Sequence, residues 1–182
     1  MAVSIVFETH ATTLDNERGL ATGWLPGELS AVGREQAREL GRRRRPDGLA
    51  AVFTSDLARA GETTQVAFSD ELPVLADWRL RECDYGDWNG RDRATVLGDR
   101  VDHLDQPYPG GESWRQAVVR VGRFLADLPT RWDGRRVLVI GHVATRYGLE
   151  VGLLGRSLEQ LLAQEFVWQE GWEYELGAGP VC

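Results

Sequence analysis

The sequence has few cysteines, no lysine and no long apolar run. Only Cys83 and Cys182 carry thiols among its 182 residues, so neither a disulfide framework nor a Cys-x-x-Cys motif can be built. No apolar window approaches the roughly 20 residues that a bilayer-spanning helix needs, and the N-terminus lacks a charged region followed by an apolar one. We therefore expect a reducing compartment and a cytoplasmic protein that does not associate with membranes.

The charge composition is acidic. The 21 basic side chains, all of them arginine, oppose 28 acidic ones, for a formal net charge of −7 and a pI near 5.0. This balance favours neither nucleic acid nor an anionic membrane as a partner. The run Arg42 to Arg45 ends a predicted helix, where cations complement the carbonyl end of the helix dipole, and we interpret it in that way. Arginine also binds oxyanions in a fixed planar geometry, which favours a small anionic substrate.

Short apolar, β-branched runs alternate with helical patterns along the chain. Four runs are typical of buried strands, at 3–7, 49–55, 72–76 and 135–142. Helices are predicted from the Ser30 cap to about Arg45, directly after the second strand, and after the Ser113 cap. This alternation predicts an α/β protein with a mostly parallel sheet between two helical layers. The length fits a single domain over 1–182. The segment 165–177 is expected to form an edge strand or hairpin whose tryptophans belong to the core.

Polar motifs fall where three of these strands end. His10 ends the first strand, the stretch TSDLARA at 54–60 begins at the end of the second, and His142 ends another. In an open α/β sheet the ligand crevice lies beyond the carboxyl ends of the strands. Because the chain has only three histidines, two of them at one crevice indicate a functional pair.

Six motifs, in order along the chain, resemble those of the histidine phosphatase superfamily, whose members have a phosphoglycerate-mutase-like fold. They are THATTLDN at 9–16, LSAVGREQA at 29–37, TSDLARAGETT at 54–64, LRECDYGDWNG at 80–90, PGGES at 109–113 and VLVIGHVATR at 137–146. The resemblance covers most of the chain and implies a three-layer α/β/α fold.

The resemblance also implies a phosphohistidine mechanism. The ring of His10 would attack a phosphoryl group and form a covalent intermediate. Arg59 and Asn16 would bind the phosphoryl oxygens, and His142 would donate a further hydrogen bond to them. Glu82 would protonate the leaving oxygen and then accept a proton from water, which requires a carboxyl group with a raised pKa. Neither a metal nor another cofactor is implied.

The first motif departs from the family pattern. Where the family has Arg-His-Gly-Glu, this chain has Thr9, His10, Ala11 and Thr12, and Glu8 occupies a usually aliphatic strand position. The lost arginine is the most serious change, because removing one preorganised donor to a developing oxyanion costs about 100- to 1,000-fold in rate. The resemblance is therefore to a divergent member.

Strand alternation affects what these departures mean. If Thr9 faces one side of the strand, Glu8 and His10 share the other. Glu8 could then hold the tautomer of the imidazole or pair with an arginine. Arg18 and Arg146 are the candidates to supply the positive charge that the substrate site has lost.

Three functions remain open on the sequence. The first is a phosphoric monoester hydrolase, slow or narrow in substrate, that acts through His10. The second is an enzyme that uses the same pocket for acid/base chemistry on a small organic acid, and the third is an inactive ligand-binding protein. Hydrolysis is favoured over a mutase reaction, because the stretch between the second strand and PGGES is too short for the insertions that shield the intermediate from water in mutases.

The segment 88–112 is expected to form a lid that sets substrate specificity. Trp88, His103 and Tyr108 within it are candidates for contact with substrate or for packing. The seven tryptophans could also form a homodimer surface.

Overall fold

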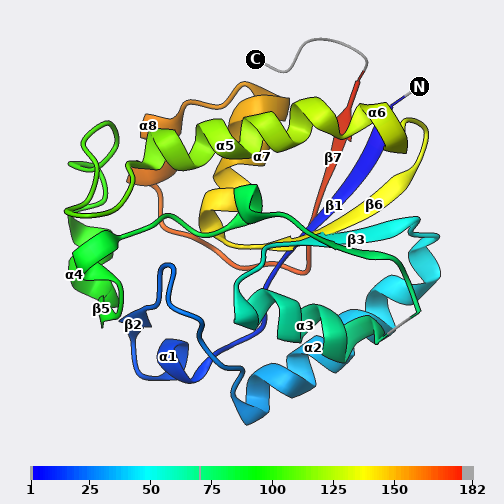
Figure 1. The fold of residues 1–182 in the computed structure, drawn as a ribbon, viewed down its shortest axis with the longest axis horizontal. Helices are drawn as coiled ribbons and strands as arrows, with labels where there is room; N and C mark the ends of the chain where they lie inside the picture. Colours follow the sequence, from blue (N-terminus) through cyan, green and yellow to red (C-terminus); the bar gives the residue numbers. More distant parts are fainter. Residues whose placement is uncertain (1, 70, 178–182) are drawn as a thin grey trace.

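The computed structural model describes residues 2–69 and 71–177, and its centre is a five-stranded sheet (Figure 1). Across the sheet the order is β4-β3-β6-β1-β7. Strands β1, β3, β4 and β6 run parallel, and β7 pairs antiparallel with β1 at one edge. Their bounds are β1 (Val3–Thr9), β3 (Ala51–Thr54), β4 (Val74–Ala76), β6 (Arg136–Gly141) and β7 (Trp172–Leu176). The four predicted parallel strands and the predicted final edge strand are thus all present.

Helices cover both faces of the sheet (Figure 1). One face carries α2 (Ala31–Arg44) and α3 (Ala58–Phe68); the other carries α5 (Trp114–Asp127) and α7 (Val143–Leu154), while α6 (Pro129–Trp132) and α8 (Leu158–Ala163) follow them in the chain. The side chains of β1 alternate between the two cores: Phe7 packs with the α5 side and Val6 with the α2 side. The predicted three-layer α/β/α architecture is confirmed.

The helices α2 and α5 begin at the predicted capping residues, Ser30 and Ser113. Ser30 Oγ accepts a hydrogen bond from the Gly33 backbone NH at 3.1 Å, and Ser113 forms a capping box with Gln116. Gly33 also permits a close approach, because a Cβ there would lie 1.9 Å from the carbonyl oxygen of Thr12. The start of α2 can therefore pack directly against the loop that follows His10.

Small elements surround the carboxyl ends of the parallel strands. They are α1 (Leu14–Glu17), β2 (Leu20–Ala21), β5 (Arg91–Asp92), α4 (Arg93–Gly98) and the 3-10 turns at Trp78–Leu80 and Gly86–Trp88. A further 3-10 turn, Arg45–Asp47, joins α2 to the amino end of β3. Within the segment expected as a lid, α4 is the one α-helix among the described residues. Trp88, His103 and Tyr108 pack on one another, with the His103 and Tyr108 rings stacked at 3.7 Å between centroids. Of the two roles expected for these side chains, packing is the one the structure supports, since none of them lines a described cavity.

Only one of the two tryptophans in the segment 165–177 belongs to the core, although both were expected to. Trp172 packs against the core, but Trp168 is 57% exposed because it precedes β7 in an irregular stretch.

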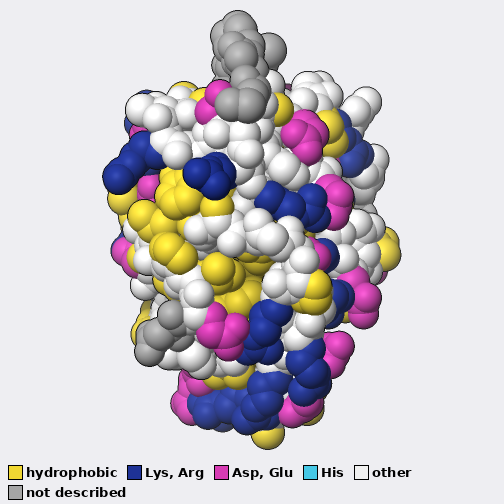
Figure 2. Space-filling model, turned by 90° about the vertical axis from the view of Figure 1, so that its right-hand side faces the viewer, with side chains coloured by type: hydrophobic (Ala, Val, Ile, Leu, Met, Phe, Trp, Pro, Cys, Tyr) yellow, Lys and Arg dark blue, Asp and Glu magenta, His cyan; other side chains and the backbone are white. Residues whose placement is uncertain are grey.

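Hydrophobic side chains gather on the face shown in Figure 2. Exposed apolar side chains of the molecule include Val74, Leu75 and Trp78 at and after the edge strand β4. A homodimer remains a prediction. Among the described residues, none of the helices is long and apolar enough to cross a membrane.

Candidate active site

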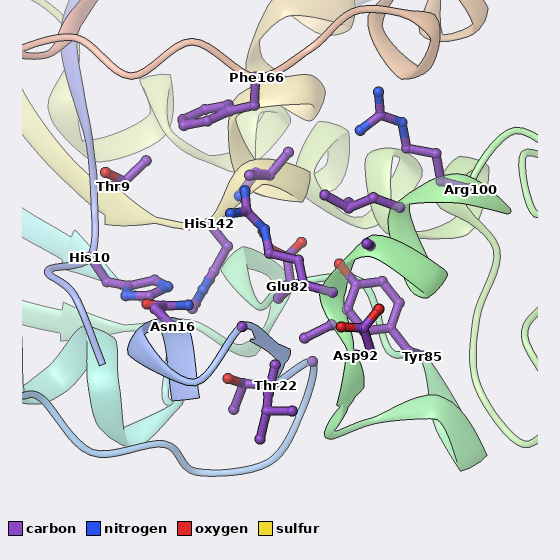
Figure 3. Close-up of a pocket in the computed structure, with 18 of the residues that line it drawn as sticks. Thr9, His10, Asn16, Thr22, Glu82, Tyr85, Asp92, Arg100, His142 and Phe166 are labelled. Carbon is purple, nitrogen blue, oxygen red and sulfur yellow. Dashed lines mark hydrogen bonds between the residues drawn. The ribbon is translucent and has the colours of Figure 1, made fainter. Parts of the chain in front are cut away.

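A cavity of about 600 Å³ opens at the carboxyl ends of the parallel strands (Figure 3). It brings together six of the residues predicted from the sequence, which come from four separate parts of the chain: Thr9, His10, Asn16, Arg59, Glu82 and His142. The parallel topology explains this meeting, because β1, β3 and β6 are neighbours and end at the same edge of the sheet.

His10 lies immediately after β1, and its backbone NH donates to the carbonyl of Gly141 at 2.9 Å. Its Nδ1 donates to the Ala11 carbonyl at 2.8 Å, so this nitrogen carries the proton. Its Nε2 accepts a hydrogen bond from Arg59 Nε at 3.3 Å and therefore holds a lone pair. Burial, and then the charge of Arg59, lower the pKa of His10 to about 3. The imidazole is therefore neutral and nucleophilic at physiological pH.

Arg59 lies between the two histidines, in the first turn of α3, and is 2% exposed. Its guanidinium donates to the carbonyls of Gly23 and Leu25 at 2.8 and 2.9 Å, and its Nη2 lies 3.3 Å from His142 Nδ1. The rings of His10 and His142 are 5.0 Å apart between centroids. The backbone carbonyls thus fix a cation beside both imidazoles.

His142 precedes α7 and is 1% exposed. Since Arg59 can only donate, Nδ1 of this ring accepts, and Nε2 donates to Ser55 Oγ at 2.7 Å. Burial and the nearby Arg59 hold the pKa of His142 well below its usual range. If the proton moves to Nδ1, the Ser55 hydroxyl can donate to Nε2 in its place, and the hydrogen bond from Arg59 to Nδ1 is lost. Ser55, which the sequence analysis did not assign to the site, thus permits either tautomer.

The Glu82 carboxyl lies at the start of α7. Its Oε1 accepts from the backbone NH groups of Cys83 and Ala144 at 2.9 and 3.1 Å, and Oε2 accepts from that of Val143 at 3.3 Å. Burial raises the pKa of Glu82, although these hydrogen bonds and the charges of Arg59 and Arg120 oppose the shift. A carboxyl group with a raised pKa can donate and accept protons near neutral pH.

Arg120 holds the backbone that presents Glu82. This guanidinium is 3% exposed and donates to the carbonyls of Arg79, Arg81 and Glu82 at 2.7–2.8 Å, and it forms an ion pair with Glu112. Glu112 belongs to the PGGES motif, so the motif acts here by holding an arginine in place. The sequence analysis missed Arg120, because its position on the apolar face of α5 carries no local signal.

Asn16 lines the cavity and also caps a helix. Its Oδ1 accepts from the Thr13 backbone NH at 3.0 Å, and its own NH donates to Thr13 Oγ1 at 3.0 Å. Among the described residues none accepts a hydrogen bond from its side-chain nitrogen, which is therefore free for another acceptor. Its turn-forming and substrate-facing roles are compatible.

Glu8 lies on the opposite side of β1 from Thr9, as strand alternation predicts. It is 1% exposed, and its Oε1 accepts from Arg43 at 3.0 Å and from Arg44 at 2.8 Å. Of the two roles considered for this carboxylate, arginine pairing is therefore correct and holding the His10 tautomer is wrong, because Ala11 does that. The two arginines also offset the negative charge that Glu8 brings near the cavity. The arginine run at the end of α2 thus has a specific buried partner in addition to the helix dipole.

Neither arginine proposed to replace the lost charge lines the cavity. Arg18 is exposed after α1. Arg146 pairs with Glu150 at 2.6 Å and lies 4.6 Å from the ring centroid of Trp172. The structure thus places the Arg18 side chain outside the cavity, and it holds Arg146 against Glu150 and two aromatic rings.

Two arginines of the α4 region border the cavity instead. Arg93 is exposed, and no side-chain partner for it is found in the described part of the chain. Arg100 donates to the carbonyls of Leu162 and Gln164 at 2.5 and 2.8 Å. Only the packing of α4 over the strand ends brings these residues to the site, and their spacing in the sequence gave no signal. With Arg59 they balance the lining carboxylates of Glu82, Asp92 and Glu165.

In residues 2–69 and 71–177, no group of three or more His, Cys, Asp or Glu side chains is placed to hold a metal ion. Of the two cysteines, Cys83 is buried with a free thiol, and Cys182 lies outside the described residues.

The fold and this histidine pair define a class of proteins that contains phosphatases and phosphoglycerate mutases. The chain matches the model of the histidine phosphatase superfamily (branch 1) over residues 5–166 and belongs to that superfamily. It is 35% identical over 174 residues to a 2,3-bisphosphoglycerate-dependent phosphoglycerate mutase of Methylobacterium sp. (strain 4-46), covering 86% of this chain and 83% of the relative. A protein of the same name from Parvibaculum lavamentivorans is 31% identical over 188 residues, covering 94% and 90%.

Solved structures of phosphatases are also similar. The alpha-ribazole phosphatase from Shigella flexneri superimposes with a TM-score of 0.77 at 27% identity, covering 88% of this chain and 84% of that one. A mycobacterial glucosyl-3-phosphoglycerate phosphatase in complex with VO3 gives a TM-score of 0.77 at 26% identity, covering 89% and 85%. The relatives therefore include both mutases and hydrolases.

Proposed function

We propose that the protein is a phosphoric monoester hydrolase that forms a phosphohistidine on Nε2 of His10. The observation that carries the proposal is the fixed tautomer of His10: Nδ1 donates to the Ala11 carbonyl, which leaves the lone pair of Nε2 beside Arg59 in the cavity. A neutral imidazole with this lone pair is the form that attacks phosphorus.

The reaction has two steps. In the first, Nε2 bonds to phosphorus, the bond from phosphorus to the ester oxygen breaks, and Glu82 gives its proton to that oxygen. In the second, water attacks phosphorus as Glu82 takes a proton from it, the bond to Nε2 breaks, and inorganic phosphate leaves. Arg59 is positioned to stabilise charge on the phosphoryl oxygens, because backbone carbonyls already hold its guanidinium beside Nε2. His142 can donate to them once its proton is on Nδ1 and Arg59 Nη2 has turned from that nitrogen to the phosphoryl oxygens.

The replacement of the motif arginine by Thr9 makes the reaction slow or restricts its substrates. The substrate is a small anionic phosphate ester, whose charge Arg93 and Arg100 can offset from the α4 side of the cavity. Of the two, Arg93 has no side-chain partner among the described residues and is free to bind an anionic group of the substrate. The chemical step is weakened by the loss of the motif arginine.

A panel of phosphate monoesters, including p-nitrophenyl phosphate, tests the proposal at pH 5 to 8 with wild type and His10→Ala. We expect phosphate release by wild type that His10→Ala abolishes, and ³²P retained on acid-labile, base-stable histidine after a brief incubation with labelled ester. Equal rates for both proteins would overturn the proposal. Turnover of small organic acids without any turnover of phosphate esters would favour the acid/base alternative, and binding without turnover would favour an inactive protein.

Phosphoglycerate mutase activity is a second candidate, supported by the relatives of that name at 31–35% identity. It differs from hydrolysis in the fate of the phosphoryl group, which returns to the organic product instead of passing to water. Incubation with 3-phosphoglycerate and 2,3-bisphosphoglycerate distinguishes the two. Formation of 2-phosphoglycerate without inorganic phosphate would favour the mutase, and the reverse would favour the hydrolase.

A further inference from the structure

A second cavity, of about 520 Å³, adjoins the candidate active site. It runs between α2, the loop after His10 and the irregular segment that precedes β7. Six residues line both cavities: Thr9, His10, Thr12, Asn16, Arg93 and Phe166. The two cavities therefore join and form one cleft. The short Thr9 side chain lies where they join, and a longer side chain there would narrow the passage between them.

The segment 164–171, which we call the strap, forms one wall of this cleft. Three separate elements hold it. Arg44 donates to the Glu170 carbonyl at 2.9 Å, Arg100 donates to the Gln164 carbonyl at 2.8 Å, and the guanidinium of Arg146 lies 5.4 Å from the Phe166 ring centroid. A Cβ at position 171 would lie 2.0 Å from Arg44 Nη2, so a glycine is needed where the strap meets α2. An irregular segment with this many anchors is held in a defined position.

The strap places two aromatic side chains along the cleft. Phe166 points toward the main cavity (Figure 3), and Trp168 lines the second. Trp168 is 57% exposed, although nothing in its irregular backbone requires a large aromatic side chain on the surface. Opposite the strap, α2 contributes Arg43, whose Nε is buried without a hydrogen-bond partner in the described part of the chain. An aromatic wall that faces an arginine is suited to a planar ring, which can stack on either side chain.

The phosphoryl chemistry sets where such a group would lie. In-line displacement requires the ester oxygen to leave on the side of phosphorus opposite Nε2 of His10, and the organic part therefore leads away from His10 to the mouth of the cavity. Phe166 and Arg93 line both the main cavity and the second cavity, so an organic part that reaches them is at the connection between the two. A substrate that extends past them reaches Trp168.

We propose that the strap is a specificity element: it selects phosphate monoesters whose organic part carries an aromatic ring, which stacks on Trp168 beyond Phe166. The proposal rests on the hydrolase function proposed above and names the class of its substrates. The ring would lie between the strap and Arg43 of α2.

The test compares a phosphate ester that has a ring with one that has none. Dissociation constants of 1-naphthyl phosphate and glycerol 3-phosphate are measured by calorimetry, separately from hydrolysis, for wild type, Trp168→Ala and the control Trp78→Ala. Trp78 is 51% exposed, matching Trp168, but lines neither cavity. We expect wild type and Trp78→Ala to bind the naphthyl ester about tenfold more tightly, which corresponds to about 1.4 kcal/mol. In Trp168→Ala the ratio should fall to about one or two.

The outcomes separate this proposal from the hydrolase function. Hydrolysis of both esters through His10 with a ratio near one in wild type would overturn the ring preference and leave the function intact. A preference that persists in Trp168→Ala would also overturn it, because the ring would then bind elsewhere. A preference lost in Trp168→Ala without any hydrolysis would support the subsite and overturn the hydrolase. Absence of both binding and hydrolysis would overturn both.

Discussion

Replacing Thr9 with arginine would restore a positive charge at the phosphoryl site. Thr9 lines both cavities at the end of β1, so a longer side chain has space to enter. The neighbouring carboxylate of Glu8 is already bound by Arg43 and Arg44, and it faces the other side of the strand. The new guanidinium would therefore be available to the substrate and would not be captured by Glu8.

The expected gain follows from the value of one donor to a developing oxyanion. Such a donor contributes about 100- to 1,000-fold to kcat, or about 2.7–4 kcal/mol of transition-state stabilisation. Repulsion from buried Arg59 reduces this value, and we expect Thr9→Arg to raise kcat toward the lower limit, about 100-fold. Because added bulk narrows the passage to the second cavity, the gain should be larger for glycerol 3-phosphate than for 1-naphthyl phosphate.

The assay follows phosphate release from glycerol 3-phosphate by wild type, Thr9→Arg and Thr9→Gln, each with and without His10→Ala. Thr9→Gln is the matched control, since it adds length without charge. If Thr9→Arg is no faster than Thr9→Gln, the charge at position 9 does not limit the reaction and the reasoning is refuted. A silent wild type with an active, His10-dependent Thr9→Arg would mean that the scaffold supports phosphoryl transfer but that the natural chemistry differs.

Four further predictions concern the buried titratable groups. Glu82→Gln should lower kcat by about 100-fold or more for glycerol 3-phosphate, and by less for p-nitrophenyl phosphate, because the leaving oxygen of the latter needs little protonation. Equal losses for the two esters in assays of phosphate release would argue against Glu82 as the acid. Because the pKa of Glu82 is raised, the rate of the first step should fall as the pH rises through that pKa. His10, with a pKa of about 3, should stay neutral down to about pH 3. A first-step rate that falls between pH 6 and 5 in pre-steady-state assays would contradict this prediction. The lowered pKa of His10 also means that the unfolded state binds a proton first as pH falls below about 6.5, so stability is lost from there down to pH 3; urea titrations should show a smaller loss in His10→Asn. Glu8→Val, which restores an aliphatic residue, should destabilise the fold by about 1–3 kcal/mol, because Arg43 and Arg44 lose a buried hydrogen-bond acceptor while Arg44 keeps its ion pair with Asp47. Arg44→Met in the same chain should recover part of this loss, and additive losses in urea denaturation would show that Glu8 and Arg44 are not coupled.

The sequence predicted the parts of the site that depend on strand ends. His10, Arg59 and His142 each lie next to the carboxyl end of a strand in the sequence, and parallel strands end at one edge of the sheet. Their meeting therefore follows from strand order alone, and family motifs added Glu82. Helix caps at Ser30 and Ser113 were also correct, since a cap is a contact between residues three positions apart.

The sequence could not identify the partners of charged side chains. Glu8 pairs with arginines 35 and 36 residues away, and Arg120 holds backbone carbonyls about 40 residues away. Arg18 and Arg146 were chosen as replacement cations because they lie close in sequence to the catalytic residues, yet Arg93 and Arg100 are the ones that reach the cavity. Proximity along the chain is a poor guide to long arginine side chains, whose direction is set by whatever packs around them.

By itself, the sequence determined the order of strands and helices, the chemistry at the strand ends and the loss of the motif arginine at position 9, because each depends on local spacing and residue type. The tertiary structure decided how the remaining charges are distributed. It buried Glu8 between two arginines of α2, brought Arg93 and Arg100 to the cavity, and fixed the strap with Trp168 along the cleft. These are contacts between segments far apart in the chain, and their geometry is set by packing of helices on the sheet rather than by any pattern within one segment.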